Sequence, residues 1–205
     1  MKLRKLEMLL EQVTGFEQPS PAMEQYQTPA ILASRVLYTA FLAGDITGLR
    51  VLDLGSGTGT LAIGAALLGA GEVIGVEADA GAIRIATENA MKMKVQISFI
   101  QAFLRKNDDL SIIPPADTVI MNPPFGAQQE HADRPFIMAA LEKADVVYGI
   151  FNAGSEPFIR KYIAGKGEIT GVISAGCTIP RTFFFHTEDR REIPVEIIIM
   201  KRIQR

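Results

Sequence analysis

Four residues at the end of an apolar run have the chemistry to hold a planar amino group. Asn122, Pro123, Pro124 and Phe125 directly follow residues 117–121, which indicate a buried strand. Proline has a fixed φ and no N–H, so the two prolines predict a stiff loop with outward-facing carbonyls. The Asn122 amide adds a second acceptor, and Phe125 adds a flat apolar face. An amine bonded to Asn122 Oδ1 and the Pro123 carbonyl would keep its lone pair free to accept a methyl group.

A glycine-rich loop earlier in the chain is a candidate site for the methyl donor. An apolar strand predicted over residues 49–54 runs into the loop 55–59, which precedes a helix predicted over residues 60–68. Glycines let the backbone turn sharply and approach a ligand at a helix N-terminus. The spacing is G-x-G-x-G, which differs from the G-x-G-x-x-G of dinucleotide sites. The residues expected to contact a cofactor here are Asp53, Gly55, Ser56, Gly57, Thr58 and Gly59.

A carboxylate ends the next predicted strand. Glu77 follows the apolar residues 72–76, a position at which an acidic side chain can accept hydrogen bonds from both hydroxyls of a ribose. Asp79 stands two residues later, before a predicted helix over residues 80–93. It has two interpretations, a second ligand contact or the N-cap of that helix. We expect Glu77 to bind ribose.

Strands and helices alternate along most of the chain. Strands are expected over residues 49–54, 72–76, 95–100, 117–121, 145–150, 168–175 and 193–201. Helices are expected over residues 2–13, 29–43, 60–68, 80–93, 134–143 and 156–164. This order predicts an α/β fold, a Rossmann-like doubly wound sheet of seven strands, mostly parallel with one antiparallel edge strand. The first and fourth strands should be neighbours, which would bring the glycine loop beside Asn122.

Further expectations concern the two ends of the chain and the connections. Residues 1–205 are interpreted as one domain, in which residues 1–45 form an N-terminal helical extension. The glycine and polar residues of the loop 126–133 predict a mobile lid. Residues 176–192 are expected to form a long connection between the last two strands.

Composition limits the function classes. The net charge is −2 over 205 residues, which argues against a strong free-standing nucleic-acid binder. Residues 160–205, however, hold nine Lys/Arg and five Asp/Glu, a net of +4, so phosphate contacts are expected there. No apolar run approaches the roughly 18–20 residues of a membrane span. The single cysteine, Cys177, fits a cytoplasmic setting, and the presence of only two histidines argues against a His-based metal site.

At this point the motifs resemble a known superfamily. Residues 53–59 with Glu77 resemble the S-adenosylmethionine site of class I methyltransferases, and residues 122–125 resemble their amino-methylating signature. The whole chain is similar to the methyltransferase-like protein five family, small RNA adenine-N6 methyltransferases that act on small-subunit ribosomal RNA. The matching segments are residues 15–17, 24–26 with 28, 67–71, 117–126, 147–148 and 185–186.

The resemblance implies roles for more residues. Gln25, Tyr26 and Thr28 would close over the cofactor, and residues 122–125 would hold the adenine. The residues implied near the target nucleotide, besides Phe125, are Phe185 and His186, and Arg190 is a further candidate for substrate binding. Ala78, Ala102 and Phe103 are assigned to the cofactor site, although the family often has an acidic residue where Ala102 stands. The family also implies a small zinc-ribbon activator protein that adds a strand to a sheet edge, formed by residues 73–76 or 95–100.

Three alternatives remain open. The same loop geometry can hold another planar amine or amide, such as a protein glutamine or guanine N2. A nicotinamide dehydrogenase is disfavoured by the glycine spacing and by residues 122–125. The third is a non-catalytic RNA- or protein-binding module on this scaffold.

Residues 150–152 and 187–191 lack the basic runs that the family carries there, which bears on the substrate more than on the reaction type.

Overall fold

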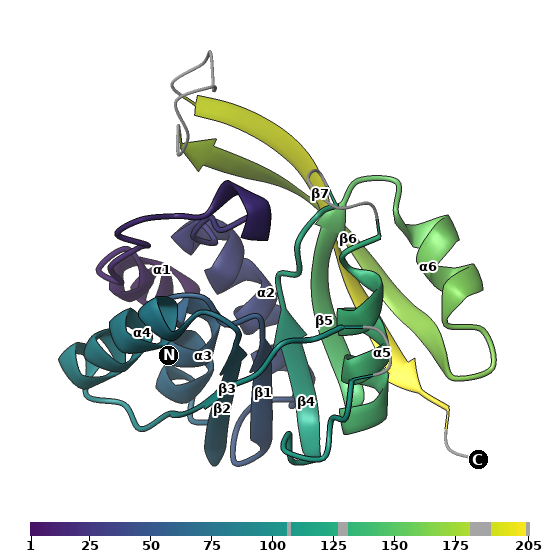
Figure 1. Cartoon of the computed structure of the whole chain (residues 1–205), viewed down its shortest axis with the longest axis horizontal. Helices are drawn as coiled ribbons and strands as arrows, with labels where there is room; N and C mark the ends of the chain where they lie inside the picture. Colours follow the sequence, from purple (N-terminus) through teal and green to yellow (C-terminus); the bar gives the residue numbers. More distant parts are fainter. Residues whose placement is uncertain (106–107, 127–130, 181–189, 204–205) are drawn as a thin grey trace.

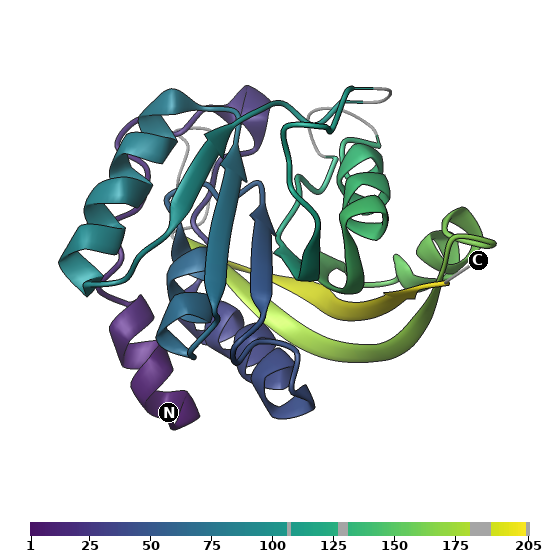
Figure 2. The same ribbon diagram turned by 90° about the horizontal axis from the view of Figure 1, so that it is seen from below.

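The fold is a seven-stranded sheet with helices on both faces (Figures 1 and 2). The computed structural model describes residues 1–105, 108–126, 131–180 and 190–203. The strands are β1 (Arg50–Leu54), β2 (Glu72–Glu77), β3 (Ser98–Gln101), β4 (Ala116–Met121), β5 (Ala144–Asn152), β6 (Gly167–Pro180) and β7 (Arg190–Arg202). The helices are α1 (Leu3–Leu10), the short 3₁₀ helix η1 (Pro21–Met23), α2 (Ala30–Ala43), α3 (Thr60–Leu67), α4 (Ala80–Met93), α5 (Arg134–Lys143) and α6 (Glu156–Tyr162).

The strand order is β3-β2-β1-β4-β5-β7-β6, which confirms the predicted doubly wound architecture. All neighbouring pairs from β3 to β5 are parallel. Strand β7 is antiparallel to both of its neighbours. It therefore belongs to the hairpin that ends the sheet and lies one position in from the edge, which β6 occupies. Strands β1 and β4 are adjacent, as predicted, and they bring the glycine loop and Asn122 to the same end of the sheet.

The expected connection over residues 176–192 is wrong, because much of it is strand. Pairing between β6 and β7 continues from Gly176 opposite Pro194 to Pro180 opposite Arg190. Pro194 lies beyond Val195, the last β7 residue paired with β5, so β7 has β6 as its one strand neighbour there. A strand with one free side tolerates a residue without an N–H. The two strands project past the end of the sheet where the parallel strands finish (Figure 1).

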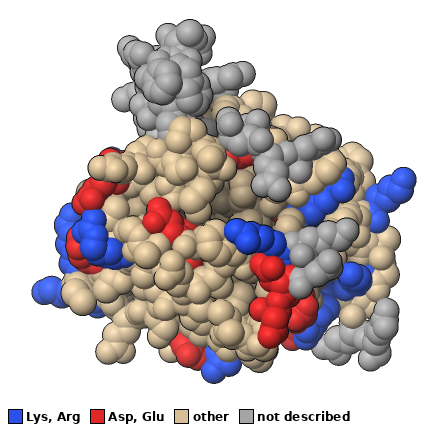
Figure 3. All heavy atoms as spheres, viewed as in Figure 1, with Lys and Arg blue, Asp and Glu red and all other residues tan. Residues whose placement is uncertain are grey.

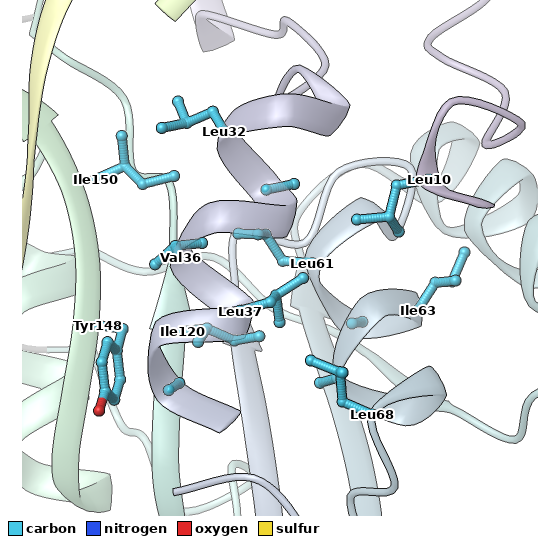
Figure 4. Close-up of a cluster of buried hydrophobic side chains, with 14 of the residues drawn as sticks. Leu10, Leu32, Val36, Leu37, Leu61, Ile63, Leu68, Ile120, Tyr148 and Ile150 are labelled. Carbon is cyan, nitrogen blue, oxygen red and sulfur yellow. The ribbon is translucent and has the colours of Figure 1, made fainter. Parts of the chain in front are cut away.

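Two apolar clusters cover the sheet. Helices α1, α2 and α3 pack on one face, and α5 and α6 pack on the other (Figure 2). In the first cluster, side chains of α2 and α3 meet Ile120 of β4 and Ile150 of β5 (Figure 4). Gly64 lets α2 approach α3, since a Cβ there would lie 2.3 Å from Leu37 Cδ1. The described part of the chain has no helix that combines the length and the apolar character that a membrane span requires.

Candidate active site

A cavity of about 1180 Å³ lies at the carboxyl ends of the central strands. All but one of the predicted cofactor residues line it: Gln25, Tyr26, Thr28, Asp53, Gly55, Ser56, Gly57, Thr58, Glu77, Ala78, Ala102, Phe103 and Asn122. Gly59 is absent from the lining. It precedes α3 with a φ of 90°, and a Cβ there would lie 3.2 Å from Ala86 of α4. Gly59 therefore serves the turn and the packing of α3 against α4.

The glycine loop is held from β2 by the Glu77 carboxylate. Oε2 of Glu77 accepts a hydrogen bond from the Gly57 N–H at 2.8 Å, and Oε1 accepts from the N–H groups of Ala78 and Asp79. Gly57 has a φ of 52°, and a Cβ there would lie 2.9 Å from Phe16 Cζ. A residue with a side chain would therefore be strained and crowded at this position. The carboxylate predicted to bind ribose also organises the loop beside it.

Asp53 presents a buried carboxyl oxygen to the cavity. The residue is fully buried, and its Oδ2 accepts a hydrogen bond from the Ala62 N–H at 2.8 Å. Oδ1 has no hydrogen-bond partner among the described residues. Burial, with a smaller contribution from Glu77, raises the pKa of Asp53 from 3.8 to about 7. The site thus contains an acceptor that a cationic donor from a ligand would satisfy.

The segment before α2 crosses the site and bonds to both halves of it. Gln25 is buried, and its Nε2 donates to Asp79 Oδ2 at 2.8 Å while its Oε1 accepts from the Ser20 N–H. Asp79 Oδ1 accepts from the Gly81 N–H and caps α4. The Gln25 hydrogen bond is the main reason that the pKa of Asp79 is lowered. Because Asp79 does not line the cavity, the N-cap interpretation is confirmed and its carboxylate anchors Gln25.

The loop after β4 carries a buried side-chain acceptor without a partner in the described residues. Asn122 Nδ2 donates to Thr28 Oγ1 at 3.0 Å, which fixes the orientation of the amide. The Asn122 Oδ1 atom is buried and has no hydrogen-bond partner within the described ranges. Leaving a buried acceptor unsatisfied costs about 1–3 kcal/mol, which a donor on a ligand would offset. Pro124 also lines the cavity, whereas Pro123 is buried outside it.

Phe125 lies at the side of the cavity and not in its lining. The ring is half-buried and packs against Tyr26, with ring centroids 5.6 Å apart and an interplanar angle of 54°. Burial raises the pKa of Tyr26 well above its usual value, so its hydroxyl stays neutral. The side chains of Tyr26 and Thr28 therefore hold the two ends of the loop that begins at Asn122.

Glu24 is a site residue to which the sequence analysis assigned no role. Its Oε2 accepts a hydrogen bond from the Phe125 N–H at 2.7 Å, and the residue lines the cavity. Its backbone is left-handed, with a φ of 49°, an uncommon conformation for a residue with a side chain. The one available signal was its place in the matching segment 24–26. Glu24 and Thr28 together tie the segment before α2 to the loop after β4.

The remaining predicted site residues belong to the segment after β3, to the start of β7 or to the residues that the structure does not describe. Ala102 lines the cavity without a polar side-chain group, and its N–H donates to the Glu77 carbonyl oxygen at 2.9 Å. Phe103 is 51% exposed, with the Arg105 guanidinium 4.4 Å from the centroid of its ring. Phe185, His186 and residues 127–130 of the expected lid lie outside the described residues. Arg190 begins β7, opposite Pro180.

Known proteins resemble this chain over most of its length. The family model of ribosomal protein L11 methyltransferase (PrmA) matches residues 37–123. The crystal structure of PH1948 from Pyrococcus horikoshii, described as a candidate RNA methyltransferase, aligns with a TM-score of 0.89. It shares 39% identity and covers 100% of this chain and 99% of that one. The rRNA N(6)-adenosine-methyltransferase METTL5 of Danio rerio is 34% identical over 97% of this chain and 98% of its own length. The Drosophila melanogaster protein of that name is 33% identical over 96% of this chain and 94% of its own. The chain therefore belongs to the METTL5 family of methyltransferases.

Proposed function

We propose that this chain is a cytoplasmic enzyme that transfers a methyl group from S-adenosylmethionine to the N6 amine of an adenine in RNA. The expected RNA is small-subunit ribosomal RNA. The observation that carries the proposal is Asn122 Oδ1, a buried acceptor without a partner in the described residues, in the same cavity as the glycine loop. METTL5 relatives that match nearly the whole chain are rRNA N6-adenosine methyltransferases, which supports the substrate.

The cofactor half of the cavity fits S-adenosylmethionine. Asp53 Oδ1 is a buried acceptor suited to the cationic amino group of the methionine part. The Glu77 oxygens retain lone pairs that can accept the ribose hydroxyls, since a carboxylate offers about four acceptor sites and three are used. When bound, the cofactor supplies an electrophilic methyl group on a sulfonium. The chain contributes the acceptors that orient it.

The substrate half orients the amine. Asn122 Oδ1 and the Pro123 carbonyl accept the two N–H groups and stabilise the positive charge that develops on nitrogen. With S-adenosylmethionine bound, the amine nitrogen that these acceptors orient would take the methyl group, and the sulfur would keep the electron pair of the broken C–S bond. The methylated amine then loses its extra proton to water. Phe125 provides a stacking face, worth about 1–3 kcal/mol for a base on an aromatic ring.

The first 45 residues act, in this proposal, as an extension of one domain that closes over the cofactor. The supporting contacts are the hydrogen bonds from Gln25 to Asp79, from Asn122 to Thr28 and from the Phe125 N–H to Glu24. The first joins the segment before α2 to the N-cap of α4, and the other two join it to the loop after β4. When the segment before α2 is ordered over the cofactor, it would therefore also fix the position of the catalytic loop.

A protein partner is a second component of the proposal. Strand β3 is one edge of the sheet, whereas β2 is internal, so of the two candidate segments only the one containing β3 can accept an added strand. Met91, on the neighbouring helix α4, is 72% exposed. An activator of the small zinc-ribbon type would pair with β3 and cover such apolar surface. If the purified chain alone is monomeric and its activity does not rise with an activator, this component is wrong.

The pH dependence of cofactor binding tests the role of Asp53. In the ligand-free protein its pKa is about 7, so the carboxyl is largely protonated at pH 6. A cationic cofactor pairs with the ionised form. We expect the affinity for S-adenosylmethionine, measured by calorimetry, to rise by up to about tenfold per unit between pH 5.5 and 7 and to level off above pH 8.

The matched control for this experiment is Asp53→Asn, which keeps the shape of the side chain and removes the titration. A flat profile is expected for the variant, and the same rise in both proteins would exclude Asp53. The free energy of unfolding changes with pH in the opposite direction to the cofactor affinity. Because the folded state raises the pKa of this acid above 3.8, Asp53 lowers the free energy of unfolding of the ligand-free protein as pH rises toward 7.

The reaction itself is tested with S-adenosylmethionine labelled in the methyl group. The protein is incubated with total RNA and with a protein extract, and the digested RNA is analysed for methylated nucleosides. We expect label in N6-methyladenosine, lost in Asn122→Ala and Phe125→Ala. Label in guanine N2 or in protein glutamine would show that the proposed substrate is wrong, while the proposed mechanism of transfer would stand. Cofactor binding without transfer to any acceptor, even with a candidate activator added, would favour the binding-module alternative.

A further inference from the structure

The cavity is larger than a methyl donor and one base require. Its volume of about 1180 Å³ exceeds the upper end of typical small-molecule pockets, roughly 1000 Å³. Beyond the cofactor residues it reaches α5, α6 and the loop after α6, where its lining includes Arg134, Tyr162 and Lys166. On this face Lys and Arg side chains lie beside a hollow, with acidic side chains below them (Figure 3). This second part of the cavity has no role in the reaction described above.

Arg134 is held in this part of the cavity by two aromatic rings. Its guanidinium carbon lies 4.8 Å from the centroid of the Phe158 ring and 5.5 Å from that of Tyr162. The two rings stack on each other, with centroids 5.5 Å apart and an interplanar angle of 17°. Aromatic faces attract and orient a guanidinium without neutralising its charge. The side chain of Arg134, which begins α5, is therefore positioned on its own side of the cavity.

Arg134 forms no salt bridge in the part of the chain that the structure describes, although the carboxyl of its neighbour Asp133 attracts its charge. Other arginines are paired: Arg50 with Glu72, Arg84 with Glu17 and Glu88, Arg160 with Glu156, and Arg202 with Asp145. In addition, Arg134 Nε is buried and has no hydrogen-bond partner among the described residues. A partly buried guanidinium with an unused donor is suited to an anionic ligand with several acceptor oxygens, which in an RNA substrate is a phosphate.

A second arginine–aromatic pair lines the same cavity. Arg105 and Phe103 belong to the segment after β3, and the Arg105 guanidinium lies 4.4 Å from the ring centroid. The one acidic residue of α5 in the lining, Glu142, is eight positions after Arg134, about 12 Å along the helix. The positive partial charge of the helix terminus favours a negative group at the N-terminal end of α5, and Asp133, which precedes the helix, opposes it.

We propose that Arg134, supported by Phe158 and Tyr162, binds a backbone phosphate of the RNA strand next to the target nucleotide. The inference rests on the proposed function for the identity of the ligand. It names Arg134 as a residue that positions the substrate, because a phosphate fixed at α5 would set where the neighbouring base enters the site. Phosphate contacts position a nucleic acid without reading its sequence.

The test measures RNA binding rather than methyl transfer, so it is separate from the test of the proposed function. A fluorescent single-stranded RNA of 20 nucleotides that contains adenosines is titrated with protein by anisotropy, at salt concentrations from 50 to 200 mM. For Arg134→Gln we expect about tenfold weaker binding at 100 mM salt. We also expect the slope of log affinity against log salt to fall by about 0.7, the value for one phosphate on a single strand.

Three further variants separate a phosphate contact from damage to the fold. Arg50→Gln, which removes a paired arginine of β1 outside the cavity lining, should bind RNA as the unaltered chain does. Arg134→Lys should keep the salt slope, because it keeps the charge. Tyr162→Leu should weaken binding by a few-fold, because the guanidinium loses one of its supports.

The affinity for S-adenosylmethionine serves as the second readout and should stay within about twofold in all four variants. The inference is overturned if Arg134→Gln leaves the salt slope unchanged, or if RNA and cofactor affinities fall together. It is also overturned if the unaltered chain does not bind RNA. RNA binding with the expected slopes but without methyl transfer would retain the inference and reject the proposed reaction.

Discussion

The turnover number for methyl transfer is expected to fall by about 10²–10³-fold in Asn122→Ala. Asn122 Oδ1 is a buried side-chain acceptor that lacks a partner in the described residues, and alanine removes it. The developing charge on the amine would then lose one of its two acceptors. Because Asp53 and Glu77 remain, we expect the affinity for S-adenosylmethionine to change by less than about fivefold. Single-turnover kinetics and calorimetry measure the two quantities separately.

Thr28→Val provides the matched control for Asn122. It removes the hydroxyl that accepts the hydrogen bond from Asn122 Nδ2 and leaves the Asn122 amide in place. The amide can then rotate, so we expect an intermediate loss of about tenfold in turnover. If Asn122→Ala retained more than a tenth of the activity, the proposed role of this residue in transfer would be wrong.

The second large effect is expected for cofactor binding in Glu77→Gln, with at least 100-fold weaker affinity for S-adenosylmethionine. The Glu77 carboxylate accepts hydrogen bonds from the N–H groups of Gly57, Ala78 and Asp79. In a glutamine, the NH₂ group would replace one of the two carboxylate oxygens. It would then face backbone N–H groups, which are also donors, so those hydrogen bonds would be lost. The glycine loop would lose its support, and the ribose hydroxyls would lose an acceptor. The same substitution therefore affects both the shape of the site and its chemistry.

The stability of the protein should fall as well. Hydrogen bonds to a charged group contribute about 1.5–3 kcal/mol each, so we expect Glu77→Gln to lower the free energy of unfolding by about 2–4 kcal/mol. Thermal unfolding measures this loss. Glu72→Gln is the control, because Glu72 lies on the same strand, is exposed and pairs with Arg50 at the surface. An unchanged cofactor affinity in Glu77→Gln would contradict the predicted ribose contact.

Local patterns in the sequence were enough to predict the framework of this site. The glycines at 55 and 57 have positive φ, as a sharp turn beside a helix N-terminus requires. The alternation of apolar strands and amphipathic helices predicted the parallel order that places β1 beside β4. These features follow from backbone preferences and periodicity over a few residues, so they can be read without knowing the partners of each segment.

The limits of the last two strands could not be read in the same way. Residues 176–180 and 190–192 were expected in a long connection, which contains Arg181, three successive phenylalanines at 183–185, His186, Arg190 and Arg191. In the folded chain the β6–β7 pairing extends to Pro180 and Arg190. Whether such residues form strand depends on the neighbour that accepts and donates their backbone hydrogen bonds, and that neighbour is a tertiary feature.

The contacts that complete the site join residues far apart in the chain. Asn122 meets Thr28 across 94 positions, and the Phe125 N–H meets Glu24 across 101. Arg134 acquires its aromatic support from α6, more than 20 residues later. Each of these side chains is ordinary in its local sequence. The sequence alone therefore predicted which loops carry the chemistry. Only the packing of the N-terminal segment and of α6 decided which atoms those loops leave unsatisfied, because a buried donor or acceptor is defined by partners that the local sequence does not contain.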